Sequence, residues 1–159
     1  MKGTHTYTQK HPGVARRIIT ACGVSGAVSN DELQRGFPHP PKEVRRALWD
    51  TGSTLSAISS RLANKLGLER IGRAKNHSAF GPMESNVYSV NLFLPDGKTE
   101  LAQVSVVCID IDESVDILLG MDVITMCDFA ITNVDEKTTF SFQIPSVSTV
   151  DFEKHIIEK

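Results

Sequence analysis

The sequence lacks several features that would place it in a common functional class. Its 159 residues contain no apolar run approaching the roughly 20 residues needed to cross a bilayer. The first residues, MKGTHTYTQKHPG, lack the apolar core of a signal peptide. The formal net charge of −2 gives no excess of basic residues for a nucleic-acid surface. We therefore expect neither a membrane nor a nucleic acid as a partner.

Residues that bind metals or form disulfides are also scarce. The three cysteines, Cys22, Cys108 and Cys127, form no CxxC pair and lie in apolar segments, which is typical of reduced thiols in a cytoplasmic protein. The five histidines are scattered, and none has the spacing of zinc ligands on a helix. The sequence thus predicts no metal site and no cofactor.

Three segments resemble functional motifs but each lacks a required residue. GKT at 97–99 has no upstream glycine of a phosphate-binding loop and lies in a predicted hairpin turn. GVSGA at 23–27 lacks the last glycine of a nucleophile elbow. DIDESVD at 110–116 lacks the central glycine and the terminal glutamate of a calcium loop. None of the three supports a function.

The apolar pattern predicts one mostly β domain. The apolar and β-branched segments predict strands at 15–25, 44–50, 53–59, 69–95 (broken at 79–83), 100–109, 117–120, 129–132 and 138–145. Ile58, Leu62 and Leu66 share one helical face, with Ser59 or Ser60 as the N-cap and Gly67 at the end. Many strands at short spacing, with one or two short helices, favour a barrel or a sandwich.

The remaining segments divide the chain into three parts. Residues 1–14 are predicted to be a flexible polar leader, and residues 15–145 the folded domain. Within that domain, residues 26–43 form a long loop with one helical turn at its acidic centre. Residues 121–127 are predicted to form a short helix. Residues 146–159 are a C-terminal tail that is a candidate dimer contact.

One carboxylate stands out because it interrupts an apolar run. In ALWDTGS, residues 47–53, Asp50 follows a predicted strand and precedes a predicted tight turn at Thr51-Gly52. Asp50 could be a turn residue that ends the strand, or a carboxylate sheltered for catalysis. A second element, DILLGMDVI at 116–124, places an apolar-apolar-Gly segment 70 residues after Asp50. The two segments at this separation form a more specific sequence signature than either segment alone.

Together these two segments resemble the retropepsin-like aspartic proteases, the single-lobe, retroviral-type family. The resemblance covers roughly residues 15–145 and implies a mainly β, closed or partly open barrel of the retropepsin type with one or two short helices. It implies that Asp50 is the catalytic aspartate and that the Thr51 hydroxyl braces two active-site loops against each other. It also implies that Gly52 permits the tight turn and that Ser53 donates a hydrogen bond to the carboxylate. Leu118, Leu119 and Gly120 would support the loop by packing.

The same resemblance implies a flap, the hairpin that closes over the substrate. The candidate segment is HSAFGPMES at 77–85, with Phe80, Gly81 and Pro82 at its centre. Flaps in this family are usually rich in glycine, whereas this segment has only Gly81, followed by Pro82. The sequence therefore predicts a stiffer or shorter flap.

A single Asp-Thr-Gly implies a shared active site. Hydrolysis by aspartic proteases needs two carboxyls that share one proton. The chain has only one Asp-Thr-Gly and is too short to contain two lobes of this kind. The expected enzyme is therefore a homodimeric aspartic endopeptidase that binds an extended peptide across a twofold axis. Two alternatives stay open: a retropepsin-fold dimerisation or peptide-binding module with little proteolysis, and an unrelated barrel in which Asp50 is structural.

Overall fold

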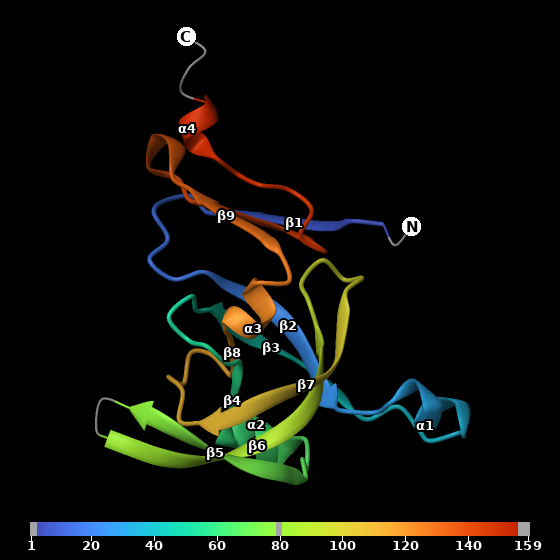
Figure 1. The fold of residues 1–159 in the computed structure, drawn as a ribbon. Helices are drawn as coiled ribbons and strands as arrows, with labels where there is room; N and C mark the ends of the chain where they lie inside the picture. The colour runs from blue at the N-terminus through green and yellow to red at the C-terminus, as the bar shows by residue number, and fades with distance from the viewer. Residues whose placement is uncertain (1–2, 79–80, 156–159) are drawn as a thin grey trace.

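The computed structural model describes residues 3–78 and 81–155, and most of its regular structure is β (Figure 1). The ten strands described are β1 (His5–Lys10), β2 (Ile19–Gly26), β3 (Lys42–Trp49), β4 (Ala57–Ser59), β5 (Arg70–Ser78), β6 (Gly81–Phe93), β7 (Glu100–Ile109), β8 (Ile117–Leu119), β9 (Asp128–Thr132) and β10 (Thr139–Ile144). The short helices are α1 (Asn30–Gln34), α2 (Ser60–Lys65), α3 (Met121–Ile124), α4 (Phe152–His155) and the 3-10 turn η1 (Val134–Glu136).

Six of the strands close into a barrel. The order is β2-β3-β8-β4-β7-β6, and β6 pairs again with β2 to complete the ring, while β5 extends β6 outside it. The β3–β8 and β4–β7 pairs are parallel, and every other pair in this sheet is antiparallel. β6 can reach β2, β5 and β7 because it is 13 residues long. The predicted mainly β, closed barrel is confirmed.

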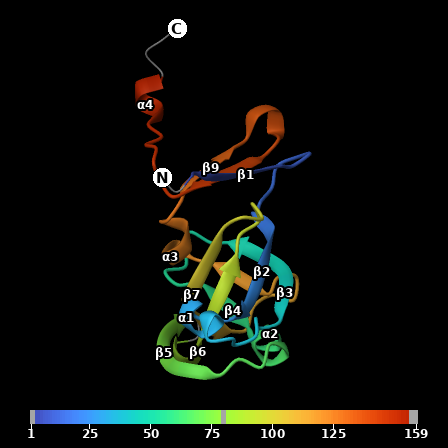
Figure 2. The same cartoon turned by 90° about the vertical axis from the view of Figure 1, so that its right-hand side faces the viewer.

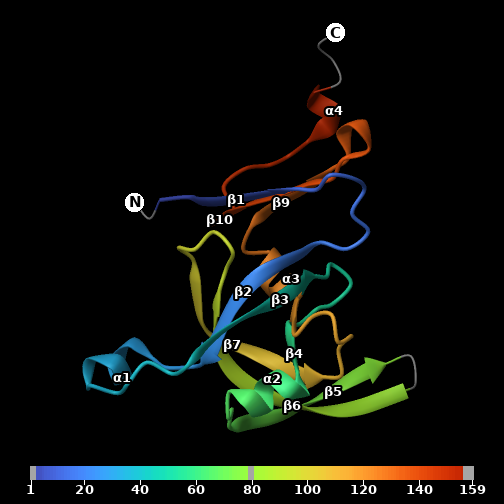
Figure 3. The ribbon, with the colours of Figure 1, turned by 180° about the vertical axis from the view of Figure 1, so that it is seen from behind.

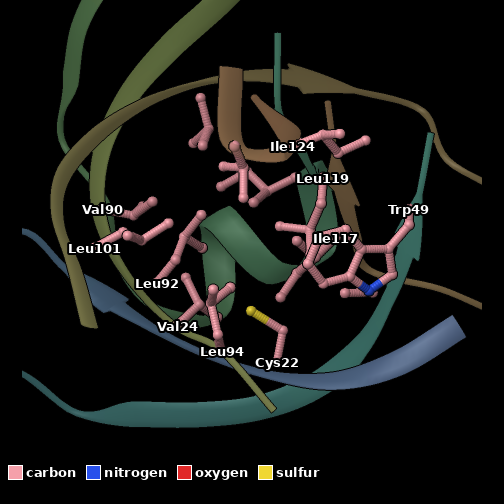
Figure 4. Close-up of a cluster of buried hydrophobic side chains, with 14 of the residues drawn as sticks. Cys22, Val24, Trp49, Val90, Leu92, Leu94, Leu101, Ile117, Leu119 and Ile124 are labelled. Carbon is pink, nitrogen blue, oxygen red and sulfur yellow. The ribbon is translucent and has the colours of Figure 1, made fainter. Parts of the chain in front are cut away.

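The barrel encloses an apolar core in which side chains from opposite walls meet (Figure 4). Val24, Val90, Leu92, Ile117 and Leu119 are fully buried. Burial alternates along β3, as expected for a strand with one apolar face, whereas β2 and β4 contain runs of consecutive buried residues. Burial also raises the pKa of the Cys22 thiol to about 12, so this core thiol stays protonated.

The helices described are short, and none is long and apolar enough to span a membrane. The predicted helix after residue 58 is α2, whose first turn is capped by the Ser59 hydroxyl and which ends before Gly67 at φ +61°. The predicted helical turn in loop 26–43 is α1, where Ser29 and Glu32 form a reciprocal capping box.

A three-stranded sheet, in the order β1-β10-β9, forms a second layer above the barrel (Figures 1 and 2). Its aromatic side chains pack onto Trp49 of the barrel, with ring centroids 5.2 Å from Phe140 and from Phe142 and 5.9 Å from Phe129. Aromatic contacts at these distances are favourable beyond the area they bury. The second layer is therefore fastened to the end of β3.

The prediction that residues 1–14 form a flexible leader is wrong for the part the structure describes. Residues His5–Lys10 form β1, which pairs with β10 over six residue pairs. Alternate side chains of β1, including Tyr7 and Gln9, are half-buried. The segment has little apolar character, so its stability depends on a partner strand about 130 residues away, which the local sequence does not indicate.

The segment after β10 is held by one carboxylate. Asp128 accepts hydrogen bonds from Gln143 Nε2 (2.6 Å), from the Ser146 hydroxyl, and from the backbone N–H groups of Val147 (2.9 Å) and Ser148 (2.7 Å). These donors, Gln143 first, hold the pKa of the Asp128 carboxyl well below its usual range. Asp128 thus fixes the direction in which the C-terminal tail leaves the second layer.

This contact predicts acid release of the tail. Because the folded-state pKa of Asp128 is lowered, its contribution is present above about pH 4 and is lost as the pH falls toward the folded value. Hydrogen exchange should show falling protection of the Val147 and Ser148 amides below about pH 4. Asp128→Asn should lower that protection at neutral pH, whereas Asp110→Asn, at an exposed position, should not. Unchanged protection in Asp128→Asn would contradict this role.

Candidate active site

Asp50 lies directly after β3, where the parallel partner strand β8 ends. Ala47, Leu48 and Trp49 pair with Ile117, Leu118 and Leu119. The ladder continues one step further, because the Asp50 N–H donates to the Leu119 carbonyl at 2.9 Å. Asp50 is half-buried, at the edge of the apolar core. Strand pairing therefore places a carboxylate where the barrel interior meets the surface.

The strand before Asp50 is anchored by Trp49. Its indole Nε1–H donates to the Thr20 hydroxyl at 3.0 Å, and its ring is buried between the barrel and the second layer. A buried indole N–H needs such a partner. Trp49 thus fixes the backbone immediately before the carboxylate.

The residues after Asp50 form a tight turn. The Gly52 N–H donates to Asp50 Oδ1 at 2.9 Å, and the Ser53 N–H donates to the Asp50 carbonyl at 3.3 Å. A Cβ at position 52 would lie 3.2 Å from Asp50 Oδ1, which is tight and favours glycine. Thr51 and Gly52 are exposed. The turn orients the carboxylate and leaves its edge accessible.

Ser53 makes a different contact from the predicted one. Its hydroxyl donates to the Leu55 carbonyl at 2.7 Å rather than to the Asp50 carboxylate. The bond closes the loop on itself two residues further on. In this chain Ser53 therefore shapes the loop, and the predicted hydrogen bond to Asp50 is not the one formed.

The loop after Asp50 packs closely against Gly120. A Cβ at position 120 would lie 2.7 Å from the Leu55 carbonyl carbon and oxygen, and 3.0 Å from the Ser53 oxygen. The loop also accepts hydrogen bonds from the first N–H groups of α3, from Met121 to Ser53 O (2.8 Å) and from Asp122 to Thr54 O (3.2 Å). Only glycine permits this approach, so its role exceeds the core packing expected from sequence.

These contacts also explain why β4 covers only Ala57–Ser59, whereas a strand was predicted at 53–59. The carbonyls of Ser53 and Thr54 are used by α3 instead of a neighbouring strand, and the strand begins only at Ala57. The segment 53–56 is therefore a loop held by a helix start rather than part of the sheet.

Two residues that sequence reasoning missed hold this arrangement together. The fully buried Ser56 hydroxyl donates to Asp122 Oδ1 (2.7 Å) and accepts from the Gly120 N–H (3.0 Å). The Ser56 N–H donates to Asp122 Oδ2 at 3.0 Å. In the sequence, Ser56 stands out only as a serine within an apolar segment, and Asp122 only as an acidic residue in the first turn of α3. We call Ser56, Gly120 and Asp122 the loop anchor.

The candidate flap is the hairpin of β5 and β6. Asn76 pairs with Met83, His77 with Pro82 and Ser78 with Gly81, whose φ is +112°. Phe80, the third predicted flap residue, lies outside the described residues. The hairpin projects on the side of the barrel where the loop after β3 lies (Figures 1 and 3). The structure thus supplies a hairpin with the predicted Gly81-Pro82 at its end.

No group of three or more histidine, cysteine, aspartate or glutamate side chains within residues 3–78 and 81–155 is arranged to hold a metal ion. The chemical groups that the site offers are a half-buried carboxylate, an exposed threonine hydroxyl and an ordered backbone turn.

Comparison with known proteins identifies the family. A family model described as aspartyl protease matches residues 41–123, just over half of the chain. The chain belongs to the aspartyl protease family. The matched segment contains the turn at Asp50, the hairpin of β5 and β6, and the loop anchor. Membership supports aspartic protease activity in general.

A solved structure agrees with the fold of this aspartyl protease family member. It is a retropepsin-like aspartic protease from Rickettsia conorii, with 11% sequence identity and a TM-score of 0.50. The similarity covers 90% of this chain and 97% of that one, so it includes strands outside the family-model match. A search of curated protein sequences gave no significant match.

The loop anchor predicts a large effect of Asp122. Asp122→Ala would leave the Ser56 hydroxyl and N–H without their acceptor and should lower the free energy of unfolding by roughly 2–4 kcal/mol. Asp122→Asn keeps one acceptor oxygen and should cost less. Denaturant unfolding measures both, with Asp110→Ala at an exposed site as the control. Equal stabilities for Asp122→Ala and Asp110→Ala would contradict the anchoring role.

Proposed function

We propose that this chain is an aspartic endopeptidase whose active site forms between two copies, each contributing Asp50. The observation that carries the proposal is the geometry of the Asp50 turn, in which strand pairing, a tight turn and the loop anchor hold one half-buried carboxylate at the barrel surface. One carboxyl cannot take a proton from water and give one to the carbonyl oxygen in the same step, and the sequence contains one Asp-Thr-Gly.

In the proposed dimer, the two Asp50 carboxyls face each other and share one proton. The ionised carboxylate takes a proton from a water molecule as that water attacks the scissile carbonyl. The protonated carboxyl gives its proton to the carbonyl oxygen, which forms a tetrahedral intermediate. The carboxyl that took the proton from water then gives it to the leaving nitrogen, the C–N bond breaks, and the other carboxylate takes a proton back from a hydroxyl of the intermediate. Neither a metal nor a cofactor takes part in these steps.

Thr51 and Gly52 would form the contact between copies. Both residues are exposed, and within the described residues the Thr51 hydroxyl has no hydrogen-bond partner. We propose that this hydroxyl braces the turn of the partner copy, as the family resemblance implies. Because Gly52 has no side chain, it would leave room for the substrate to lie against the turn.

The substrate would be an extended peptide covered by the hairpin of β5 and β6. Ile71 and Met83 on this hairpin are 59% and 53% exposed and would offer apolar contacts to such a peptide. We propose Phe80, Gly81 and Pro82 as the flap. One glycine followed by proline would give it limited movement.

We also propose residues 15–145 as the protease domain, to which β1 adds a strand, and residues 146–159 as a dimer contact. Val147, Val150 and Phe152 in this tail are 65%, 55% and 65% exposed. Three apolar side chains within six residues favour a protein contact over a solvated end.

The first test is cleavage of a peptide library by the wild type and by Asp50→Asn. Loss of the carboxylate should lower kcat/KM by at least about 1,000-fold, because neither acid nor base function remains. Equal cleavage by both proteins would assign the activity to a contaminant. Sedimentation of both proteins reports whether dimers persist.

The second test asks whether two copies share the site. Mixing equal amounts of wild type and Asp50→Asn, with time for exchange, should leave about one quarter of the dimers with both carboxylates. Activity should therefore fall to about half that of the same wild-type protein alone. An unchanged activity would contradict a shared site, provided that the two species exchange.

A peptide-binding or dimerisation module is the second candidate, favoured by the glycine-poor flap. In that case Asp50→Asn would retain the binding of an uncleaved peptide, and neither protein would hydrolyse it.

A further inference from the structure

The connection between α1 and β3 carries a proline-rich sequence, RGFPHPP at residues 35–41, that the candidate active site does not use. Three of the seven prolines of the chain, Pro38, Pro40 and Pro41, fall within it. Arg35 lies three residues before Pro38, and Pro38 lies three residues before Pro41, so the sequence reads R-x-x-P-x-x-P. We call residues 35–41 the proline segment. It projects with α1 from the side of the barrel away from the β5–β6 hairpin (Figures 1 and 3).

The backbone of the proline segment is restricted toward the polyproline II conformation. Residues 37–41 belong to no helix or strand, and the peptide bonds before the three prolines are trans. Each proline ring fixes its own φ in the polyproline II range. Phe37, His39 and Pro40 each precede a proline, which disfavours the helical region for them and favours an extended backbone. Every residue from 37 to 41 is therefore restricted by its own ring or by the ring that follows it.

Both ends of the proline segment are fixed by regular structure. At its start, Gly36 follows the last turn of α1 with a φ of +88°, and its N–H donates to the Leu33 carbonyl at 3.0 Å. At its end, Lys42 is the first residue of β3 and pairs with Ser25 of β2. A partner that binds the segment would therefore meet a preorganised chain with little conformational entropy left to lose.

The middle of the proline segment presents apolar rings to solvent. Pro40 is half-buried against the end of β2, where its Cβ lies 3.9 Å from the position of a Cβ on Gly26. Pro38 and Pro41 are exposed, and Phe37 is 57% exposed. Because a polyproline II helix has three residues per turn, Pro38 and Pro41 lie on the same face of it. Pro40 thus fastens the segment to the barrel and leaves that face open.

The proline segment also offers a positive charge. Arg35 is exposed and has no ion pair among residues 3–78 and 81–155. The Glu32 carboxylate, in the preceding turn of α1, accepts instead from the Ser29 N–H at 2.7 Å and from the Ser29 hydroxyl at 2.8 Å. An exposed guanidinium of this kind can pair with a carboxylate on another protein.

We propose that the proline segment is a docking site for a partner protein that holds a polyproline II helix in an aromatic-lined groove, as SH3 domains do. Pro38 and Pro41 pack between the aromatic side chains of the groove, and Phe37 adds apolar contact area. Arg35 pairs with a carboxylate beside the groove, which sets the direction in which the segment lies. A partner bound here does not cover the β5–β6 hairpin, so docking and the proposed peptide cleavage are separate properties.

The test is titration of the isotope-labelled full chain with a set of purified SH3 domains that bind R-x-x-P-x-x-P peptides, followed by NMR and by calorimetry. At least one domain should move the amide resonances of Arg35, Gly36, Phe37 and His39 and leave that of Gly52 in place. The same SH3 domain with a groove tryptophan replaced by alanine should not bind, because the packing surface for the prolines is then lost.

Matched variants separate the proline segment from general stickiness. Replacing Pro38 and Pro41 together by alanine should weaken binding at least about tenfold, whereas Pro12→Ala, at an exposed proline elsewhere, should have no effect. Arg35→Gln should also weaken binding about tenfold, and Arg16→Gln, at another exposed arginine, should not. Thermal unfolding of each variant shows that the barrel is intact.

Three results would overturn the proposal. The first is that no SH3 domain of the set binds, which would leave the prolines with the role of stiffening the loop. The second is binding that the double proline variant leaves unchanged. The third is movement of the Gly52 resonance without movement of those at 35–39, which would place the contact at the Asp50 turn.

Discussion

The absence of a side chain at Gly120 allows the loop after Asp50 to pack directly on the start of α3. The Leu55 carbonyl lies 2.7 Å from where a Cβ at position 120 would be, and the Ser56 hydroxyl joins the Gly120 N–H to Asp122. Because β8 ends at Leu119, the same short segment pairs with β3 and receives the loop that follows β3. The contact at Gly120 thus positions β8, the loop after Asp50 and the start of α3 relative to one another. The orientation of the Asp50 carboxylate depends on this contact.

Around this point the molecule is built in two layers with different chemistry. The barrel is apolar inside, and its contact with the second layer is aromatic on one side, around Trp49 and Phe140. On the other side the contact between the layers is polar and includes Gln9 and His11. An aromatic contact provides stability without needing hydrogen-bond partners, whereas polar atoms buried between the layers do need them.

The sequence alone was sufficient for the parts of the fold that depend on local pattern. The apolar strand before Asp50, the helix capped by Ser59 and the hairpin loop at 95–98 all have their cause within a few residues. The pairing of β1 with β10 was missed because a polar strand has no local apolar signal. Ser56 and Asp122 were missed as partners because a hydrogen bond across 66 residues has no signature in a single sequence.

The pairing of β1 with β10 also has a consequence for the order in which the molecule is made. The Thr8 and Ser141 hydroxyls lie 2.8 Å apart, although 133 residues separate them in the chain. During synthesis β1 leaves the ribosome before β10 and cannot pair with it until the residues between them have also been translated. The aromatic side chains that back Trp49 arrive on β9 and β10 at the same late stage. Until β9 and β10 have emerged from the ribosome, the growing chain therefore lacks the aromatic support behind Asp50.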